Sequence, residues 1–325
     1  MAPVIEIEGL RKQYPRHFRG RRRGPIVAID GLDLSVPEGG VFGFLGPNGS
    51  GKTTTIRCVL GLVRPTSGRM RLFGADVPRG LPAAIRSVGS IVESPAFFPT
   101  MTARENLRLL AGIDGIPNTR VDAVLERVGL AGRAGDLVRR YSLGMKQRLG
   151  LAAALLKDPA LVMLDEPANG LDPSGIRETR ELLRDLGAEG RTVFVSSHLL
   201  AEVEHTCDRV AILSRGRCVA AGTVDELLDR HHHEMIVRVD DLALGAASLG
   251  RAGMAAERRD GHLLVRVAPG DAARVTEALA ADRIWVSELR PVEHSLEERF
   301  LELTASDPDP DPERHIERDV EAVPA

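Results

Sequence analysis

The sequence predicts an α/β protein whose mainly parallel sheet lies between layers of helices, followed by a smaller α+β module. Short apolar runs such as 41–45, 161–164 and 192–195 are separated by segments expected to be helical. This alternation is typical of a parallel sheet covered by helices. From residue 230 onward the expected order is β-α-β-β-α-β-α, which is that of a ferredoxin-like module. A chain of 325 residues is long enough for both units.

Each strand expected before residue 230 is a short run rich in apolar side chains. These runs cover 4–10, 27–34, 41–45, 69–73, 88–92, 161–164, 192–195 and 210–213. The helices expected beside them cover 52–62, 102–132 with a break at 115–117, a segment after Ser142, and segments starting near Pro173, Leu199 and Thr223. The module is expected to place its seven elements at 235–239, 242–249, 255–258, 263–267, 272–280, 284–289 and 295–303.

Capping and turn residues mark several of these boundaries. Thr102 and Glu105 have the spacing of a capping box. Asp172 before Pro173 has the pattern of a helix cap followed by proline at the first helical position. Asp260-Gly261 is typical of a hairpin turn between two strands of the module.

These boundaries predict three parts of the chain. We expect a first domain over 1–229, an accessory ferredoxin-like domain over 230–304, and a disordered acidic tail over 305–325. The three histidines at 231–233 are expected to be a polar linker between the domains and not a metal site. Asp-Pro repeats from Asp307 bury little apolar surface, so the tail is expected to remain extended.

Composition restricts the classes of partner. The net charge of -3 provides no overall attraction to nucleic acid, and aromatic residues make up only 3% of the chain. The three cysteines are scattered, as in a reduced cytosolic protein. Neither a signal peptide nor a run long enough to cross a bilayer is present, so any membrane-spanning part is expected to be another chain.

Residues 46–53 fit the P-loop pattern G-x-x-x-x-G-K-[ST], between an apolar strand and a helix. Glycines let the backbone wrap so that its N–H groups point at a phosphate, and the following helix adds the positive end of its dipole. Lys52 is expected to bridge the β- and γ-phosphates, and the Thr53 hydroxyl to ligate Mg²⁺. The residues expected to hold the nucleotide here are Gly46, Pro47, Asn48, Gly49, Ser50, Gly51, Lys52, Thr53 and Thr54.

Polar residues at the ends of two later apolar strands complete the expected catalytic set. Asp165 ends one strand, and its carboxylate is expected to hold Mg²⁺. Glu166 follows and is expected to act as the general base toward an attacking water. His198 comes just after another strand and is expected to bond a γ-phosphate oxygen. These assignments make Glu166 and His198 the predicted catalytic residues.

Ser142-Leu143-Gly144 lies at an expected helix start, where backbone N–H groups are free. One P-loop already holds the nucleotide, so the simplest interpretation is that Ser142 and Gly144 face the γ-phosphate bound by another subunit. A plain serine cap is the alternative.

Together these residues resemble the ATP-binding cassette (ABC) ATPases over roughly residues 4–228. The family signature Leu-Ser-Gly-Gly-Gln is similar to residues 141–145, Tyr-Ser-Leu-Gly-Met. The resemblance implies a P-loop NTPase of the ABC type, with a RecA-like core and β-rich and helical subdomains. It also implies ATP and Mg²⁺ as cofactors and a head-to-tail homodimer. Asp172 matches the D-loop, and Tyr14 is the expected adenine-stacking aromatic, with Phe18 as the rival.

Two departures from the family pattern affect the expected site. Glu93 stands where the family has the Q-loop glutamine, so it is expected to ligate Mg²⁺ while adding negative charge near the γ-phosphate. Leu143 and Met145 replace a glycine and the glutamine of the signature. With residues 93–97, these departures make the chain similar to the bacitracin-resistance branch of drug-export ABC ATPases.

The resulting hypothesis is an ATP-hydrolysing subunit of a bacterial exporter that acts on a separate membrane permease. It would be peripheral at the cytoplasmic face of the membrane and would bind no specific nucleic acid. One alternative is a soluble ABC ATPase acting on ribosomes or nucleic acid through the basic cluster at 16–23. Another is a regulatory subunit that binds ATP but hydrolyses it poorly because of Glu93.

Overall fold

A computed structural model describes residues 3–18, 21–92, 96–228, 234–292 and 295–305. The described chain forms two compact units. One contains the residues up to Ala221 together with those from Glu297 onward, and the other spans Gly222–Leu296. The expected boundaries at 229 and 304 stay a prediction, and the expected tail and the three histidines lie outside the described residues.

A six-stranded sheet forms the centre of the first unit. Its strand order is β10-β9-β3-β8-β7-β6, and β3 pairs in parallel with both β8 and β9. Nearly all positions of the middle strands are buried, and most of these residues are apolar, as expected for a sheet covered on both faces. The strands are β3 (Gly40–Leu45), β6 (Val88–Ile91), β7 (Leu161–Asp165), β8 (Thr192–Ser197), β9 (Arg209–Ser214) and β10 (Arg217–Thr223).

A second sheet in this unit has the order β2-β1-β4-β5, with antiparallel pairs throughout. It contains β1 (Ile5–Phe18), β2 (Arg21–Val36), β4 (Ser67–Leu72) and β5 (Ala75–Val77). The sequence suggested an insert over 16–23, but the strands continue into it, with Phe18 opposite Arg21. An antiparallel ladder is built from backbone groups, so pairing extends beyond the apolar positions that predicted it.

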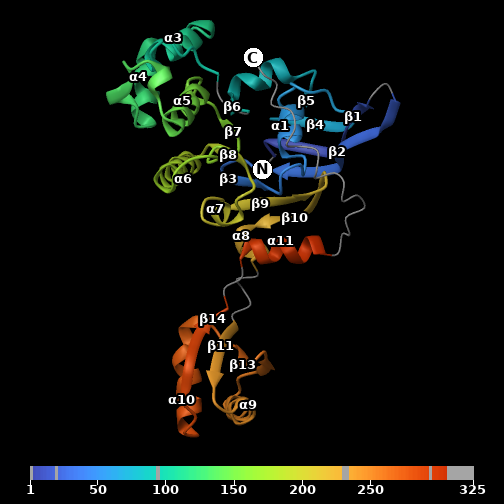
Figure 1. Ribbon diagram of the computed structural model, residues 1–325, viewed down its shortest axis with the longest axis vertical. Helices are drawn as coiled ribbons and strands as arrows, with labels where there is room; N and C mark the ends of the chain where they lie inside the picture. The colour runs from blue at the N-terminus through green and yellow to red at the C-terminus, as the bar shows by residue number, and fades with distance from the viewer. Residues whose placement is uncertain (1–2, 19–20, 93–95, 229–233, 293–294, 306–325) are drawn as a thin grey trace. The chain divides into compact units, whose positions relative to one another are not determined.

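Helices cover the central sheet and form a separate group beside it. Figure 1 shows α3, α4 and α5 together at one side of the unit, away from α1 and the β1–β2 hairpin. The helices are α1 (Lys52–Val59), α2 (Leu81–Ala84), α3 (Ala103–Ile113), α4 (Asn118–Arg127), α5 (Leu143–Leu155), α6 (Pro173–Ala188), α7 (Leu200–Glu204) and α11 (Leu296–Ala305). The predicted capping box at Thr102 and the predicted cap at Asp172 are both present. The short α2 was not predicted, and α1 ends three residues before the expected 62.

The second unit begins with α8 (Val224–Leu227) and contains a sheet of order β12-β13-β11-β14. With α9 and α10 between its strands, this is the ferredoxin-like arrangement that the sequence predicted. Its strands are β11 (Glu234–Val239), β12 (Ala256–Arg259), β13 (His262–Arg266) and β14 (Val286–Pro291), and its helices are α9 (Leu242–Arg251) and α10 (Ala272–Ala281). Asp260 and Gly261 both have positive φ, as the predicted hairpin turn requires.

A membrane-spanning helix would need a longer apolar stretch than any helix in the described part of the chain provides. The fold class predicted from the sequence, a P-loop α/β unit with an α+β module, is confirmed.

Candidate nucleotide-binding and hydrolysis site

The P-loop connects the end of β3 to the start of α1 and requires glycine at two close backbone approaches. A Cβ on Gly46 would lie 2.5 Å from the Leu213 carbonyl oxygen and 2.6 Å from Ser50 Oγ. A Cβ on Gly51, whose φ is +107°, would lie 2.5 Å from the Ala28 carbonyl oxygen. Both distances are below any normal contact, so the two glycines allow the loop to pack against its neighbours.

Donor groups gather where the P-loop meets α1. Thr55 N–H is bonded back to the Gly51 carbonyl at 2.9 Å. The N–H groups of Lys52, Thr53 and Thr54 precede this bond, so they lie in the first turn, which has no intrahelical acceptors. Ser50 is buried, and its Oγ has no hydrogen-bond partner among the described residues. Open N–H groups and an unpartnered hydroxyl fit an anionic phosphate.

Lys52 is held in the centre of this loop, with only 5% of its surface exposed. Its Nζ donates to the carbonyl oxygens of Gly46 at 2.6 Å and Pro47 at 3.3 Å. The same Nζ lies 3.2 Å from Glu166 Oε1. The lysine charge is therefore held between the loop and the first residue after β7.

Glu166 connects Lys52 to His198. Its Oε2 lies 2.7 Å from His198 Nδ1, and its Oε1 is the atom that pairs with Lys52. That Oε1 is buried and has no hydrogen bond of normal geometry, so its contact with Lys52 is an ion pair only. The structure thus brings the two predicted catalytic residues into direct contact beside the P-loop lysine.

Ser196 fixes both acidic residues, a role the sequence analysis did not assign to it. Its Oγ donates to Asp165 Oδ1 and accepts from the Glu166 N–H at 3.0 Å. Glu166 has a φ of +50°, uncommon for a residue with a side chain, and its N–H is also close to the Ser196 carbonyl. The signal was available, because Ser196 directly precedes Ser197 and His198 at the end of a predicted strand.

Thr53 and Asp165, the two described residues that were expected to ligate Mg²⁺, both carry side-chain oxygen atoms. The Asp165 side chain is 8% exposed, and Ser196 contacts one of its two carboxylate oxygens. Hydroxyl and carboxylate oxygens are the donor type that Mg²⁺ prefers. In the described ranges, which omit Glu93, no cluster of three His, Cys, Asp or Glu side chains suits a metal. The expected role of Glu93 falls outside these ranges.

Comparison with known proteins identifies the family. A model of the ABC transporter family matches residues 29–169. The uncharacterised ABC transporter ATP-binding protein YhcH of Bacillus subtilis is 40% identical over 307 residues, which are 94% of this chain and 97% of YhcH. The chain belongs to the ATP-binding proteins of ABC transporters.

Two further relatives extend this result. The bacitracin transport ATP-binding protein BcrA of Bacillus licheniformis is 38% identical over 308 residues, covering 93% of this chain and 98% of BcrA. The solved structure of cbiO1 from Clostridium perfringens, part of the ABC transporter complex cbiONQ, is 26% identical with a TM-score of 0.61. That match covers 71% of this chain and 92% of cbiO1. The present chain is therefore an ATP-binding and ATP-hydrolysing subunit.

The signature residues of this ATPase lie at the start of α5. Ser142 Oγ accepts the Met145 N–H at 3.2 Å, so the serine caps its own helix. Gly144 lies near Leu171, and Leu143 lies over Gly170, where an added Cβ would come within 2.8 Å of a Leu143 methyl group. Figure 1 places α5 with α3 and α4, apart from α1. The helix that Ser142 caps therefore lies in a different part of the unit from α1.

Asp172 and Tyr14, the remaining expected nucleotide contacts, have partners within the chain. Asp172 Oδ1 accepts the Gly175 N–H at 3.0 Å and caps α6. Tyr14 is half-buried on β1, and Lys12 Nζ lies 4.6 Å from its ring centroid, over one ring face. The side chain of Phe18 lies outside what the structure describes, so the choice between the two aromatics stays a prediction.

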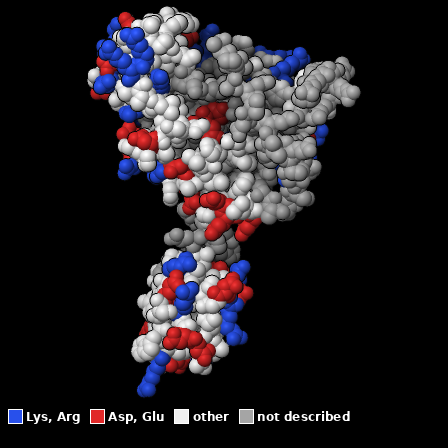
Figure 2. All heavy atoms as spheres, viewed as in Figure 1, with Lys and Arg blue, Asp and Glu red and all other residues white. Residues whose placement is uncertain are grey.

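Charged residues on the visible surface do not form a continuous basic area. Figure 2 shows Lys and Arg gathered at the end where α3 and α4 lie, with Asp and Glu among them and along the rest of the described surface in view. A backbone of nucleic acid is usually held by a wide basic stripe. The described atoms in this view form no such stripe.

Proposed function

We propose that this subunit hydrolyses MgATP to drive a separate membrane permease that exports an antibiotic or a similar compound. The Lys52–Glu166–His198 contacts at the P-loop carry the hydrolytic part of the proposal. Support for the export part comes from the bacitracin transport protein BcrA, which is similar over nearly the whole chain. The ribosome or nucleic-acid alternative receives no support from these relatives.

In this proposal Thr53, Asp165 and Glu93 hold Mg²⁺, which neutralises charge on the phosphates when it is bound. Gly46, Gly49 and the first N–H groups of α1 surround the phosphate chain, and Tyr14 stacks on the adenine. Glu166 takes the proton of the attacking water, and a positioned base of this kind contributes about 10²–10⁴ in rate. His198 holds the Glu166 carboxylate through Nδ1.

The contacts of Lys52 define a resting arrangement in this proposal. Its ammonium group pairs with the Glu166 carboxylate at 3.2 Å. A phosphate would compete for the same ammonium group, because both are anions within reach of a single cation. Nucleotide binding is therefore expected to release the Glu166 carboxylate from Lys52 while its contact with His198 remains.

The proposed assembly is a homodimer in which Ser142 and Gly144 of one copy complete the site of the other. Each site would then combine the P-loop of one subunit with the signature helix and Asp172 of its partner. The dimer would contact its permease at the cytoplasmic face of the membrane, with the module over 230–304 as an accessory domain. No nucleic acid is required in this assembly.

The experiment is steady-state ATPase measurement on the full-length subunit and on the complex purified in mild detergent. Glu166→Gln should lower kcat by about 10²–10⁴, because it removes the base, while ATP binding is retained and the dimer accumulates. Glu178→Gln, an exposed change on α6, is the matched control and should leave kcat unchanged. Wild-type turnover by Glu166→Gln would refute the base assignment, and recovery with ribosomes in place of a membrane protein would refute the transport assignment.

A further inference from the structure

The short helix α7 follows His198 and has little local support. It spans only Leu200–Glu204, and its N-cap residue Leu199 offers no side-chain acceptor to the first turn. An isolated helix of this length is not stable in water, so packing has to hold it. Because His198 lies two residues before α7, whatever fixes α7 also fixes the backbone that carries His198.

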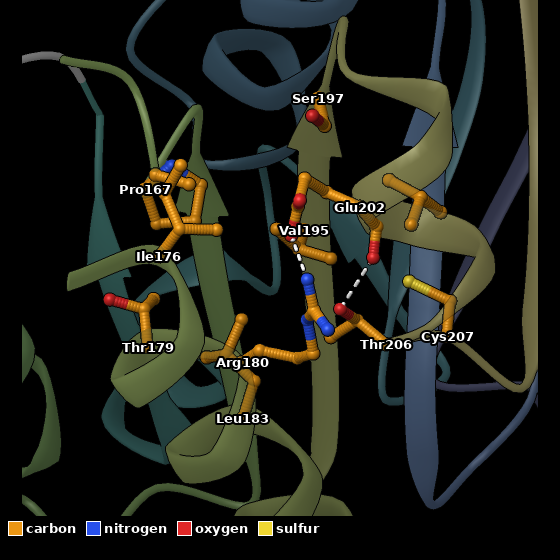
Figure 3. Close-up of a pocket in the computed structure, with 12 residues that line it drawn as sticks. Pro167, Ile176, Thr179, Arg180, Leu183, Val195, Ser197, Glu202, Thr206 and Cys207 are labelled. Atoms are coloured by element: carbon orange, nitrogen blue, oxygen red, sulfur yellow. Dashed lines mark hydrogen bonds and ion pairs between the residues drawn. The ribbon is translucent and has the colours of Figure 1, made fainter. Parts of the chain in front are cut away.

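Glu202 supports α7 through a contact with another helix and not by capping its own. It is the third residue of α7, the position from which a capping-box glutamate would turn back to the N-cap N–H. The Leu199 N–H is bonded to Ser197 Oγ instead, at 3.0 Å. The Glu202 carboxylate pairs with Arg180 Nη2 of α6. The backbone carbonyl oxygen of Glu202 accepts a hydrogen bond from Thr206 Oγ1 at 2.6 Å. Figure 3 shows the Arg180 side chain extending across the space between α6 and α7 to reach Glu202.

Helix α6 is a firm base for this pair. It has 16 residues, begins at the Asp172 cap, and buries Thr179, Leu183 and Leu186 on the face that carries its packing. Gly187 near its end packs closely on Val41 of β3. The ion pair thus joins a long, well-packed helix to a short one that the sequence alone would not hold.

The surroundings of the pair make it sensitive to substitution. Arg180 and Glu202 are 25% and 30% exposed, and Arg180 Nε is buried without a hydrogen-bond partner among the described residues. Beside them is a cavity of about 30 Å³ lined mainly by apolar side chains, including Val195, Val203 and Cys207. That volume holds only one or two waters, so it is no nucleotide site. Because both side chains are only partly exposed, removal of one charge leaves the other with only partial compensation by water.

We propose that Arg180 and Glu202 are positioning residues that set His198 for contact with Glu166. Neither touches the nucleotide site: the effect passes from Arg180 on α6 through Glu202 to α7 and the residues 197–199 before it. This inference rests on the proposed role of His198 in hydrolysis. It predicts that loss of the pair lowers kcat and leaves KM for ATP nearly unchanged, because the P-loop is unaltered.

The test is a double-mutant cycle on the full-length chain at saturating MgATP. Glu202→Gln and Arg180→Met should each lower kcat by about 10- to 100-fold, the range expected for a small displacement of a catalytic group. Arg180→Lys should recover part of the loss, since it restores a cation that can reach Glu202. In a His198→Ala background, Glu202→Gln should have no further effect. Glu178→Gln, which removes the other ion pair of α6, is the control and should not change kcat.

The remaining outcomes of this experiment would each contradict either the positioning inference or the proposed role of His198. If His198→Ala lowers kcat and Glu202→Gln lowers it again by the same factor, the pair does not act through His198 and the inference is wrong. The inference is also wrong if Glu202→Gln and Arg180→Met both leave kcat unchanged while their unfolding temperatures stay near that of the wild type. If either variant unfolds, the inference is tested with Arg180→Lys alone. Its kcat is then compared in the wild-type and His198→Ala backgrounds. Full activity of His198→Ala would overturn the proposed role of His198 and the positioning inference with it.

Discussion

At the carboxyl end of the central sheet, Lys52, Glu166 and His198 contact one another within one chain. At the start of α5, the hydrogen bond that Ser142 Oγ makes within the described chain is to the Met145 N–H of its own helix. Both regions consist of residues suited to phosphate, yet only the first is assembled by the fold of a single chain. In the proposed dimer, the first region would hold the nucleotide of its own chain and the second would face the nucleotide of the partner.

The strongest test of this contrast mixes two inactive variants. Lys52→Ala removes the P-loop cation, and Ser142→Glu places a negative charge where a partner's phosphate is expected, so each homodimer should lose hydrolysis. A mixed dimer retains one site with an intact Lys52 from one chain and an intact Ser142 from the other. ATPase assay of the mixture should therefore show activity that neither variant has alone.

A chain carrying both substitutions, mixed with an inactive Lys52→Ala chain, is the control for that experiment. No intact site can form in this mixture, because neither chain supplies Lys52. Equal inactivity of all mixtures would show that Ser142 serves the P-loop of its own chain, and the contrast between the two regions would be lost.

A smaller effect is expected from Ser196→Ala, which sharpens the account of the sheet region. Ser196 Oγ bonds both Asp165 and the Glu166 N–H, so its loss leaves buried polar groups with fewer partners. A buried group left unsatisfied costs about 1–3 kcal/mol, which chemical denaturation of the full chain should measure. The kcat should fall as well, because Glu166 loses a support. Ser90→Ala, which changes an exposed serine of β6, is the control, and equal stability of Ser196→Ala and wild type would contradict the structure of this cluster.

The smallest effect concerns Asp158, which links α4 to the amino end of β8, away from both regions. Its Oδ1 accepts from Arg191, just before β8, at 2.8 Å and from Arg120 of α4 at 2.8 Å. The pKa of the Asp158 carboxyl is lowered, mainly by the hydrogen bond from Arg191. Burial opposes this shift, and the positive charge of Arg120 adds to it. The folded-state pKa lies below the unfolded one, so the ionised carboxylate stabilises the fold above the unfolded pKa and loses that contribution as pH falls through the folded pKa.

Asp158→Asn tests this linkage without changing the backbone, since asparagine also tolerates the positive φ of this residue. Asp158 is largely exposed, so the expected loss in free energy of unfolding at pH 7 is below about 1 kcal/mol. Urea unfolding should show the same difference at pH 7 and 5 and a smaller one as pH falls below about 4. Asp76→Asn, in an ion pair inside one sheet, is the control. A difference that grows on acidification would contradict the sign.

Prediction from the sequence succeeded where a local pattern reports a local structure. The P-loop turn, the capping box at Thr102 and the order of the ferredoxin-like strands are present as expected. It was wrong over 16–23, where polar residues hid strands that backbone pairing extends. It also gave Ser196 no role, although this residue directly precedes Ser197 and His198, because Asp165 and Glu166 become its partners only through the strand register.

The sequence by itself determined which residues can bind phosphate, hold a cation or move a proton, since those properties belong to side chains and short loops. Tertiary structure decided which of them meet. The parallel register pairs Asp165 with Ser196 and Leu45 with Ser197, which brings the ends of β3, β7 and β8 to one edge of the sheet. Glu166 and His198 are 32 residues apart in the sequence, and Arg180 and Glu202 are 22 apart. Both contacts depend on that register and on helix packing. No spacing within the chain encodes them.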